Sequence, residues 1–133
     1  MEIEEIYKNV AEVIENSVGT PKESIGLDQT LFDELGVDSI DLVDILFELE
    51  SLYDIELKIN DIESRAKKEL GDKPYEIDGV ITNEGLVVIR DFMTEIDPAK
   101  LKEGLTVHEL VQLFTVHSLC KIVKYRIDEE SKS

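Results

Sequence analysis

The chain has little sulfur and little positive charge. Its 133 residues include one cysteine, Cys120, and 14 lysines and arginines against 31 acidic residues. A single cysteine excludes an intramolecular disulfide framework. The formal charge of −17 repels nucleic acid and anionic lipid surfaces and attracts basic protein patches. We therefore expect protein partners with basic docking patches and no nucleic-acid partner.

Long hydrophobic runs are also missing. No apolar stretch is long enough to span a bilayer, and no basic segment followed by an apolar one opens the chain. We therefore expect a cytoplasmic monomer without stable membrane insertion. Because the chain length suits one hydrophobic core, we expect a single domain over residues 1–130 and a disordered tail at 131–133.

Apolar residues recur at helical spacing over most of the chain. The first such segment predicts a helix over about residues 3–17, which Gly19, Pro21 and Gly26 end by opening a long loop. A second helix is predicted over about 39–52 and a third over 62–70. Capping residues predict further helices after Asn83, Thr106 and Thr115, and residues 77–81 are interpreted as a short extended piece across an Asp78-Gly79 turn. The predicted fold class is all-α.

The start of the second helix places one serine in an unusual position. Asp38 followed by Asp41 forms a variant capping box, in which Asp38 precedes the helix and Ser39 is its first residue. In this arrangement the Ser39 hydroxyl is not needed to satisfy the backbone. The pattern therefore predicts a serine side chain that is available for modification.

Acidic residues gather around this serine. From Asp28 to Asp61 there are eleven acids and one base, Lys58. Such a cluster is typical either of a docking face or of a merely solvated surface. Apolar residues cover most of the rest of the second helix, and we expect core burial for most of them, with a cavity or a partner contact as the alternative.

Ser39 has no catalytic companions in the sequence. A nucleophilic serine needs a base, but His108 and His117 lie far along the chain, and the Gly-x-Ser-x-Gly motif is absent. Two histidines and one cysteine form no recognised zinc spacing, and the segment around Asp78-Gly79 lacks the end ligands of a calcium loop. We expect no metal and no enzymatic activity. A phosphodiester on Ser39, added by another enzyme, would suit the N-terminus of a helix.

The residues around Ser39 resemble the acyl carrier protein signature. The matching run is Leu-Gly-Val-Asp-Ser-Ile-Asp-Leu-Val-Asp-Ile at 35–45, where Ile40 replaces the commoner leucine. The first amphipathic helix, the long loop, the acids of the second helix and Thr115-Val116 before the last helix extend the likeness. The resemblance implies an all-α, acyl-carrier-like four-helix bundle. It also implies that Ser39 receives 4′-phosphopantetheine from coenzyme A through a phosphopantetheinyl transferase (holo-carrier synthase).

Further roles follow from the same resemblance. The arm would carry an acyl chain as a thioester to enzymes of fatty-acid biosynthesis or other lipid metabolism, and the carrier itself would catalyse nothing. Acyl-loading and acyl-transfer enzymes would dock on the acids of the second helix, and the acyl chain would lie in an apolar cavity. The docking positions are Asp38, Asp41, Asp44 and Glu48, and the cavity positions are Val43, Leu46, Phe47 and Ile59.

The chain departs from ordinary carriers in its length. An insert at about 60–114 separates the second helix from the last one and enlarges the bundle with extra helices. In this respect the chain is similar to longer, specialised carriers, including those for the very-long-chain acyl groups of lipid A. We hypothesise a long or unusual acyl cargo, because the insert supplies additional apolar surface. The alternatives are an aminoacyl or peptidyl carrier and an acidic helical adaptor without a prosthetic group.

Overall fold

The computed structural model describes residues 2–58 and 61–131, and within them the protein is mainly helical. This confirms the predicted fold class. Within these residues, no helix is both long enough and apolar enough to cross a membrane. The elements in chain order are α1 (Ile3–Val18), η1 (Lys22–Ser24), α2 (Ser39–Tyr53), α3 (Asp61–Leu70), β1 (Glu76–Ile77), β2 (Val80–Ile81), α4 (Asn83–Phe92), η2 (Pro98–Lys100), α5 (Val107–Gln112) and α6 (Val116–Ser131).

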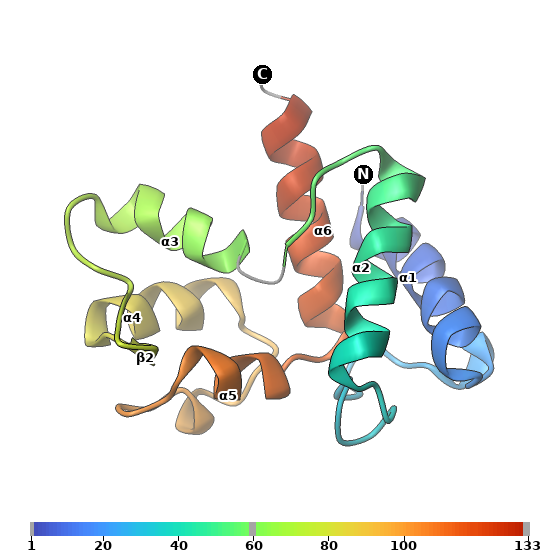
Figure 1. Cartoon of the computed structure of the whole chain (residues 1–133), viewed down its shortest axis with the longest axis horizontal. Coiled ribbons are helices and arrows are strands. Elements are labelled where there is room, and N and C mark those ends of the chain that lie inside the picture. Colours follow the sequence, from blue (N-terminus) through green and yellow to red (C-terminus); the bar gives the residue numbers. More distant parts are fainter. Residues whose placement is uncertain (1, 59–60, 132–133) are drawn as a thin grey trace.

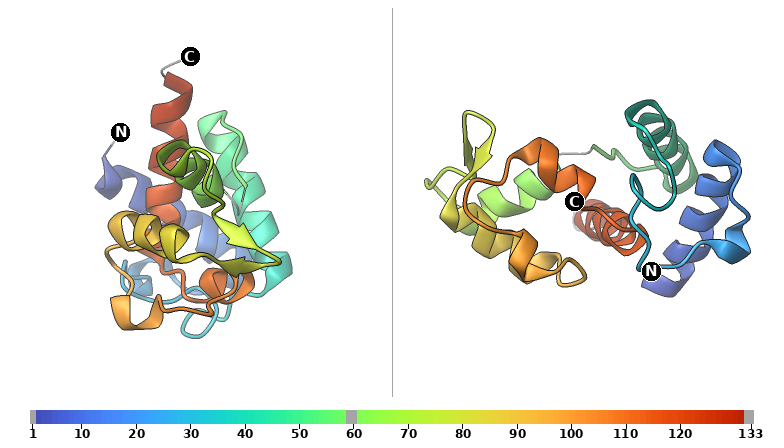
Figure 2. Two further views of the ribbon diagram at one scale, coloured as in Figure 1. Left: turned by 90° about the vertical axis from the view of Figure 1, so that its left-hand side faces the viewer. Right: turned by 90° about the horizontal axis from the view of Figure 1, so that it is seen from below.

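Helix α6 lies in the middle of the molecule. Helices α1 and α2 stand on one side of it, and α3 and α4 stand on the other (Figures 1 and 2). Helix α1 packs against both α6 and α2, whereas α3 packs against α4 and α6. We call the elements from α3 to η2, residues 61–100, the insert lobe. The insert lobe therefore lies across α6 from α1 and α2.

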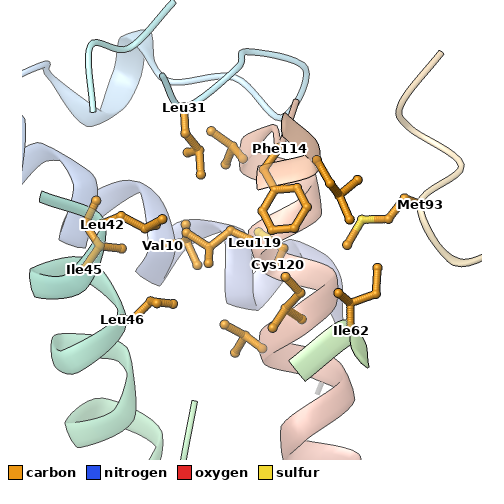
Figure 3. Close-up of a cluster of buried hydrophobic side chains, with 14 of the residues drawn as sticks. Val10, Leu31, Leu42, Ile45, Leu46, Ile62, Met93, Phe114, Leu119 and Cys120 are labelled. Atoms are coloured by element: carbon orange, nitrogen blue, oxygen red, sulfur yellow. The ribbon is translucent and has the colours of Figure 1, made fainter. Parts of the chain in front are cut away.

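One hydrophobic core joins the two sides of α6. Figure 3 shows Val10 of α1 and Ile45 of α2 near Leu119 of α6, with Ile62 and Met93 of the insert lobe on the far side. All five side chains are buried and belong to a single cluster. The insert lobe thus extends the core of the bundle instead of forming a separate one.

A hairpin connects α3 to α4 in the insert lobe. Strands β1 and β2 pair in antiparallel register across Asp78 and Gly79, which both have positive φ, at 53° and 85°. Two residues in this conformation make the tight turn that hairpins favour, which confirms the predicted extended piece. Helix α4 follows, but its cap is Thr82, whose Oγ1 accepts a hydrogen bond from Gly85 N at 3.0 Å. The predicted cap, Asn83, is instead the first helical residue.

The hairpin also holds the beginning of α5. Val107 N donates to Gly79 O, and Ile81 N donates to Leu105 O, both at 2.9 Å. The predicted capping box is present, because Thr106 Oγ1 accepts from Glu109 N while the Glu109 carboxylate accepts from Thr106 N. Main-chain pairing with β2 therefore fixes where α5 starts.

A buried ion pair joins the insert lobe to α6. Lys121 Nζ lies 2.8 Å from Glu95 Oε1, and these side chains are only 17% and 5% exposed. Lys121 also donates to Phe92 O at 2.9 Å and to Thr94 Oγ1 at 2.8 Å, and the Ser118 hydroxyl donates to Glu95. These contacts form a polar clamp between the segment after α4 and α6.

The cap of α6 is the predicted one. Thr115 Oγ1 accepts from Ser118 N at 3.2 Å, and Ser118 Oγ accepts from Thr115 N at 3.0 Å. Helix α6 then continues through Ser131, the first residue of the predicted tail. The other two residues of that tail lie outside the described residues.

Candidate functional site

Ser39 is the first residue of α2, and its hydroxyl is free. Asp38 Oδ1 accepts a hydrogen bond from Asp41 N at 2.7 Å, and Asp41 Oδ2 accepts one from Asp38 N at 3.2 Å. This is the capping box that the sequence predicts. The Ser39 side chain is exposed and makes no hydrogen bond within the described part of the chain. The backbone is thus capped by its neighbours, and the serine oxygen remains available.

Ser39 opens onto a groove between α2 and α5 with a volume of about 470 Å³. We call it the Ser39 groove. One wall is α2, the opposite wall is α5, and the loop before α2 and the segment after it close the ends. Its apolar lining is Phe32, Leu42, Val43, Leu46, Phe47, Leu57 and Val111, and its polar lining is Ser39, Glu50, Lys58, His108 and Gln112.

Three of the four predicted cavity residues line this groove. Leu46 is buried at its floor, while Val43 and Phe47 are 65% and 66% exposed along its edge. The fourth, Ile59, lies outside the described residues, but its neighbours Leu57 and Lys58 belong to the lining. The groove is therefore partly open to solvent along α2.

The predicted docking acids fall into two groups. Asp38 and Asp41 each use a carboxylate oxygen in the cap of α2. Asp44 and Glu48 are exposed, and neither makes a hydrogen bond or an ion pair within the described residues. Asp44 and Glu48 present unpaired negative charge to solvent. Asp38 and Asp41 are negatively charged too, but they also stabilise the start of α2.

Exposed apolar side chains lie beside these acids. Four apolar residues of α2 are buried as expected, namely Leu42, Ile45, Leu46 and Leu49. Ile40, however, is 74% exposed, and Val43 and Phe47 at the groove edge are exposed as well. Leu52, another apolar residue of α2, is 55% exposed. It lies over the polar outer side of α1, in a shallow groove shared with Asn9 and Glu12, instead of over the core.

Glu50 has a structural role that its place among apolar residues did not reveal. Its Oε2 accepts a hydrogen bond from Leu57 N at 2.8 Å. This bond ties the segment after α2 back onto the helix and so places Leu57 at the end of the Ser39 groove. Nothing in the local sequence identifies the pair, because the partner is a backbone group seven residues away.

His108 belongs to the surroundings of Ser39, which its distance along the chain did not suggest. It lies on α5 in the same groove as Ser39, although 69 positions separate them. Its Nε2 is 3.4 Å from Gln112 Nε2, one helical turn further on. Neither His108 nor Gln112 could be identified from the sequence as part of the site, and the same holds for Phe32 and Leu57, because only the folded chain brings these residues together.

Among the residues that the structure describes, the insert contributes to the groove through α5 alone. The lining residues between 60 and 114 are His108, Val111 and Gln112. The apolar side chains of α3 and α4 are instead buried against each other and α6, as Ile62, Leu86 and Ile89 illustrate. Within the described residues, the apolar surface that the insert adds to the groove is therefore Val111 of α5, while α3 and α4 extend the core.

Comparison with known proteins places these features in a family. The family model described as "Phosphopantetheine attachment site" matches residues 8–67, which include the greater part of α1, Ser39 and all of α2. The acyl carrier protein of Syntrophobacter fumaroxidans is 33% identical over 73 residues, which cover 54% of this chain and 90% of that protein. The acyl carrier proteins of Thermotoga maritima and Clostridium acetobutylicum are 31% identical over 77 residues and 30% identical over 67. The alignments cover 51% and 50% of this chain and 95% and 84% of those relatives. With a matching sequence, a helical bundle and a free serine at the start of α2, this chain belongs to the acyl carrier protein family.

Proposed function

We propose that Ser39 is the attachment site and that the loaded chain delivers an acyl group to enzymes of fatty-acid or lipid biosynthesis. Members of this family carry a covalently attached 4′-phosphopantetheine and act as carriers, not as catalysts. The observation that carries the proposal is the free Ser39 hydroxyl at the mouth of an apolar groove. The prosthetic group supplies a thiol, on which the cargo is held as a thioester.

The local geometry at Ser39 fits this group. A transferase would join Ser39 Oγ to the pantetheine-side phosphorus of the coenzyme A diphosphate. The P–O–P bridge breaks, adenosine 3′,5′-bisphosphate leaves, and the hydroxyl proton is lost. The resulting phosphodiester would lie at the N-terminus of a 15-residue helix, where the dipole favours negative charge. Because Asp38 and Asp41 cap each other, the reaction leaves the cap in place.

The groove favours an acyl chain over an aminoacyl group. Seven of its lining residues are apolar, and they run from the first turn of α2 to the segment after its end. Each methylene that such a surface removes from water contributes about 0.8 kcal/mol. A polar aminoacyl group gains little of this energy. The peptidyl-carrier alternative therefore has less support.

The surface of α2 is suited to enzymes with basic patches. Asp44 and Glu48 present unpaired charge beside exposed apolar residues. Residues 1–57 contain 16 of the 31 acids but only two of the 14 bases. This charge speeds encounter with a basic surface and orients it. We expect phosphopantetheinyl transferases and acyl-transfer enzymes to dock here.

Mass spectrometry tests the attachment site directly. The full chain is incubated with coenzyme A and a promiscuous phosphopantetheinyl transferase. We expect a mass gain of one phosphopantetheinyl group, lost in Ser39→Ala and kept in the matched control Ser51→Ala, which changes another exposed serine of α2. No gain in the wild type, or a gain that survives Ser39→Ala, would refute the proposal.

A second experiment tests the cargo. The loaded carrier is offered to a fatty-acyl ligase and to amino-acid-adenylating enzymes, and the thioester product is identified by mass. We expect fatty acyl groups to be loaded. Exclusive loading of amino acids would favour the peptidyl-carrier alternative instead.

A further inference from the structure

The wall of the Ser39 groove that faces α2 has a polar pair. His108 and Gln112 are one turn apart on α5 and flank the apolar Val111 in the lining. Both side chains are exposed at the groove, and both lie among the residues that surround it together with Ser39. On the α5 wall, polar groups with hydrogen-bonding capacity thus lie opposite the apolar residues that α2 contributes to the groove.

This pair has unused hydrogen-bonding capacity. Its mutual contact, at 3.4 Å between the two Nε2 atoms, involves one nitrogen of each side chain. Gln112 keeps its carbonyl oxygen and a second N–H, and His108 keeps Nδ1. Within the described residues, no other hydrogen bond of these side chains is present. Donors and acceptors are therefore both available to a ligand in the groove.

A phosphopantetheine arm on Ser39 would bring suitable groups to this pair. The arm contains two amides between its phosphate and its thiol, and amides are costly to bury against an apolar wall without partners. An arm that enters the Ser39 groove passes between α2 and α5, because these helices are its two long walls. The polar pair is the part of α5 that can bind an amide there.

We propose that His108 and Gln112 are positioning residues that bind an amide of the phosphopantetheine arm. They hold the arm against α5, so that an acyl chain on its thiol is directed along the apolar floor formed by Leu42, Leu46 and Leu57. This inference rests on Ser39 as the attachment site. It adds a binding role for two residues outside the segment that carries the family match, residues 8–67.

The chain offers a matched control for His108. Its only other histidine, His117, lies on α6 and does not belong to the Ser39 groove. The contact of His117 with Leu27 O uses the backbone N–H, so a side-chain substitution does not remove it. His117→Ala therefore changes a histidine without touching the proposed contact.

NMR of the full chain tests the contact. The ¹⁵N-labelled protein is recorded before and after loading with coenzyme A and a transferase, and loading is verified by mass. We expect the Gln112 side-chain amide and the His108 ring signals to shift on loading, while the His117 ring signals stay in place. Loading without a shift at either residue would overturn the inference and leave the proposed attachment site intact, whereas failure to load would overturn both.

The reactivity of the arm thiol with a disulfide reagent provides the second measurement. A typical net hydrogen bond corresponds to a roughly three- to tenfold change in an equilibrium. We expect His108→Ala and Gln112→Ala each to raise the reaction rate by a factor in that range. His108→Gln should largely restore the wild-type rate, because it keeps a donor and an acceptor, and His117→Ala should not alter it. Unchanged rates in both alanine variants, with unchanged circular dichroism, would overturn the inference.

Discussion

Removing the charge of Lys121 should destabilise the protein strongly. Its ammonium group is paired with Glu95 at 2.8 Å, and the Glu95 side chain is only 5% exposed. Lys121→Met keeps the apolar stem and leaves the carboxylate buried without its cation. Breaking one partner of a buried pair costs about 3–5 kcal/mol. For a chain of this size, that loss corresponds to a fall in Tm of roughly 10–20 °C.

Urea unfolding followed by circular dichroism measures this change. The matched control is Lys68→Met, which breaks the ion pair between Lys68 and Glu129 on the surface, where the side chains are 59% and 23% exposed. We expect that control to lose far less free energy of unfolding, because solvent screens an exposed pair. The double variant Lys121→Met with Glu95→Gln should recover part of the loss, because no buried charge remains.

The destabilisation caused by Lys121→Met should begin in the insert lobe. The clamp joins the segment after α4 to α6, so hydrogen exchange in Lys121→Met should rise in residues 83–100 before it rises in α1 and α2. If Lys121→Met lowers the free energy of unfolding no more than Lys68→Met does, the interpretation of Lys121 and Glu95 as a buried, unscreened ion pair is wrong.

Three other predictions concern single groups. Asp38→Ala removes the cap of α2 and should cost about 1 kcal/mol in urea unfolding, whereas Asp44→Ala should cost less than half of that; equal losses would contradict the assignment. Burial raises the pKa of the Cys120 thiol to about 12, so thiol reagents at pH 8 should label it only after unfolding, and labelling of the folded chain without its arm would contradict this. Burial also raises the pKa of the Asp61 carboxyl above its usual 3.8, although the N–H of Lys58 and the charge of Arg126 oppose this. The folded state then binds this proton more tightly than the unfolded state does, so stability falls as pH rises from about 3.8 through the folded pKa. The free energy of unfolding of Asp61→Asn, measured with urea relative to the wild type, should therefore rise as pH increases across that window and stay raised at pH 7. A difference in free energy between the two proteins that does not vary with pH would contradict this prediction.

Local features of the chain were predictable because short-range bonds determine them. Asp38 and Asp41 cap α2 through groups three residues apart, and the hairpin turn depends on two adjacent residues with positive φ. The cap of α4 was less predictable, since Thr82 and Asn83 are both good capping residues. Thr82 takes the position because its hydroxyl also donates toward Pro74 O and Tyr75 O across the hairpin.

The opposite wall of the candidate site could not be predicted. His108 and Gln112 share a groove with Ser39 only because of the way the chain folds, and periodicity within α5 does not contain that information. The same holds for Glu50, whose hydrogen bond to Leu57 depends on the path of the chain after α2. Ser39 could therefore be identified from the sequence, whereas the α5 wall of its groove could be identified only from the three-dimensional structure.

The pairing of β2 with the start of α5 has a consequence for how this protein can change over evolutionary time. Main-chain bonds from Gly79 and Ile81 hold that helix in place, and they are independent of the side chains at 108, 111 and 112. Substitutions at these three positions can alter the chemistry of the groove without shifting its wall. The insert would then act as a scaffold that lets the chemistry of the groove diversify while the acidic surface of α2 and its serine are preserved.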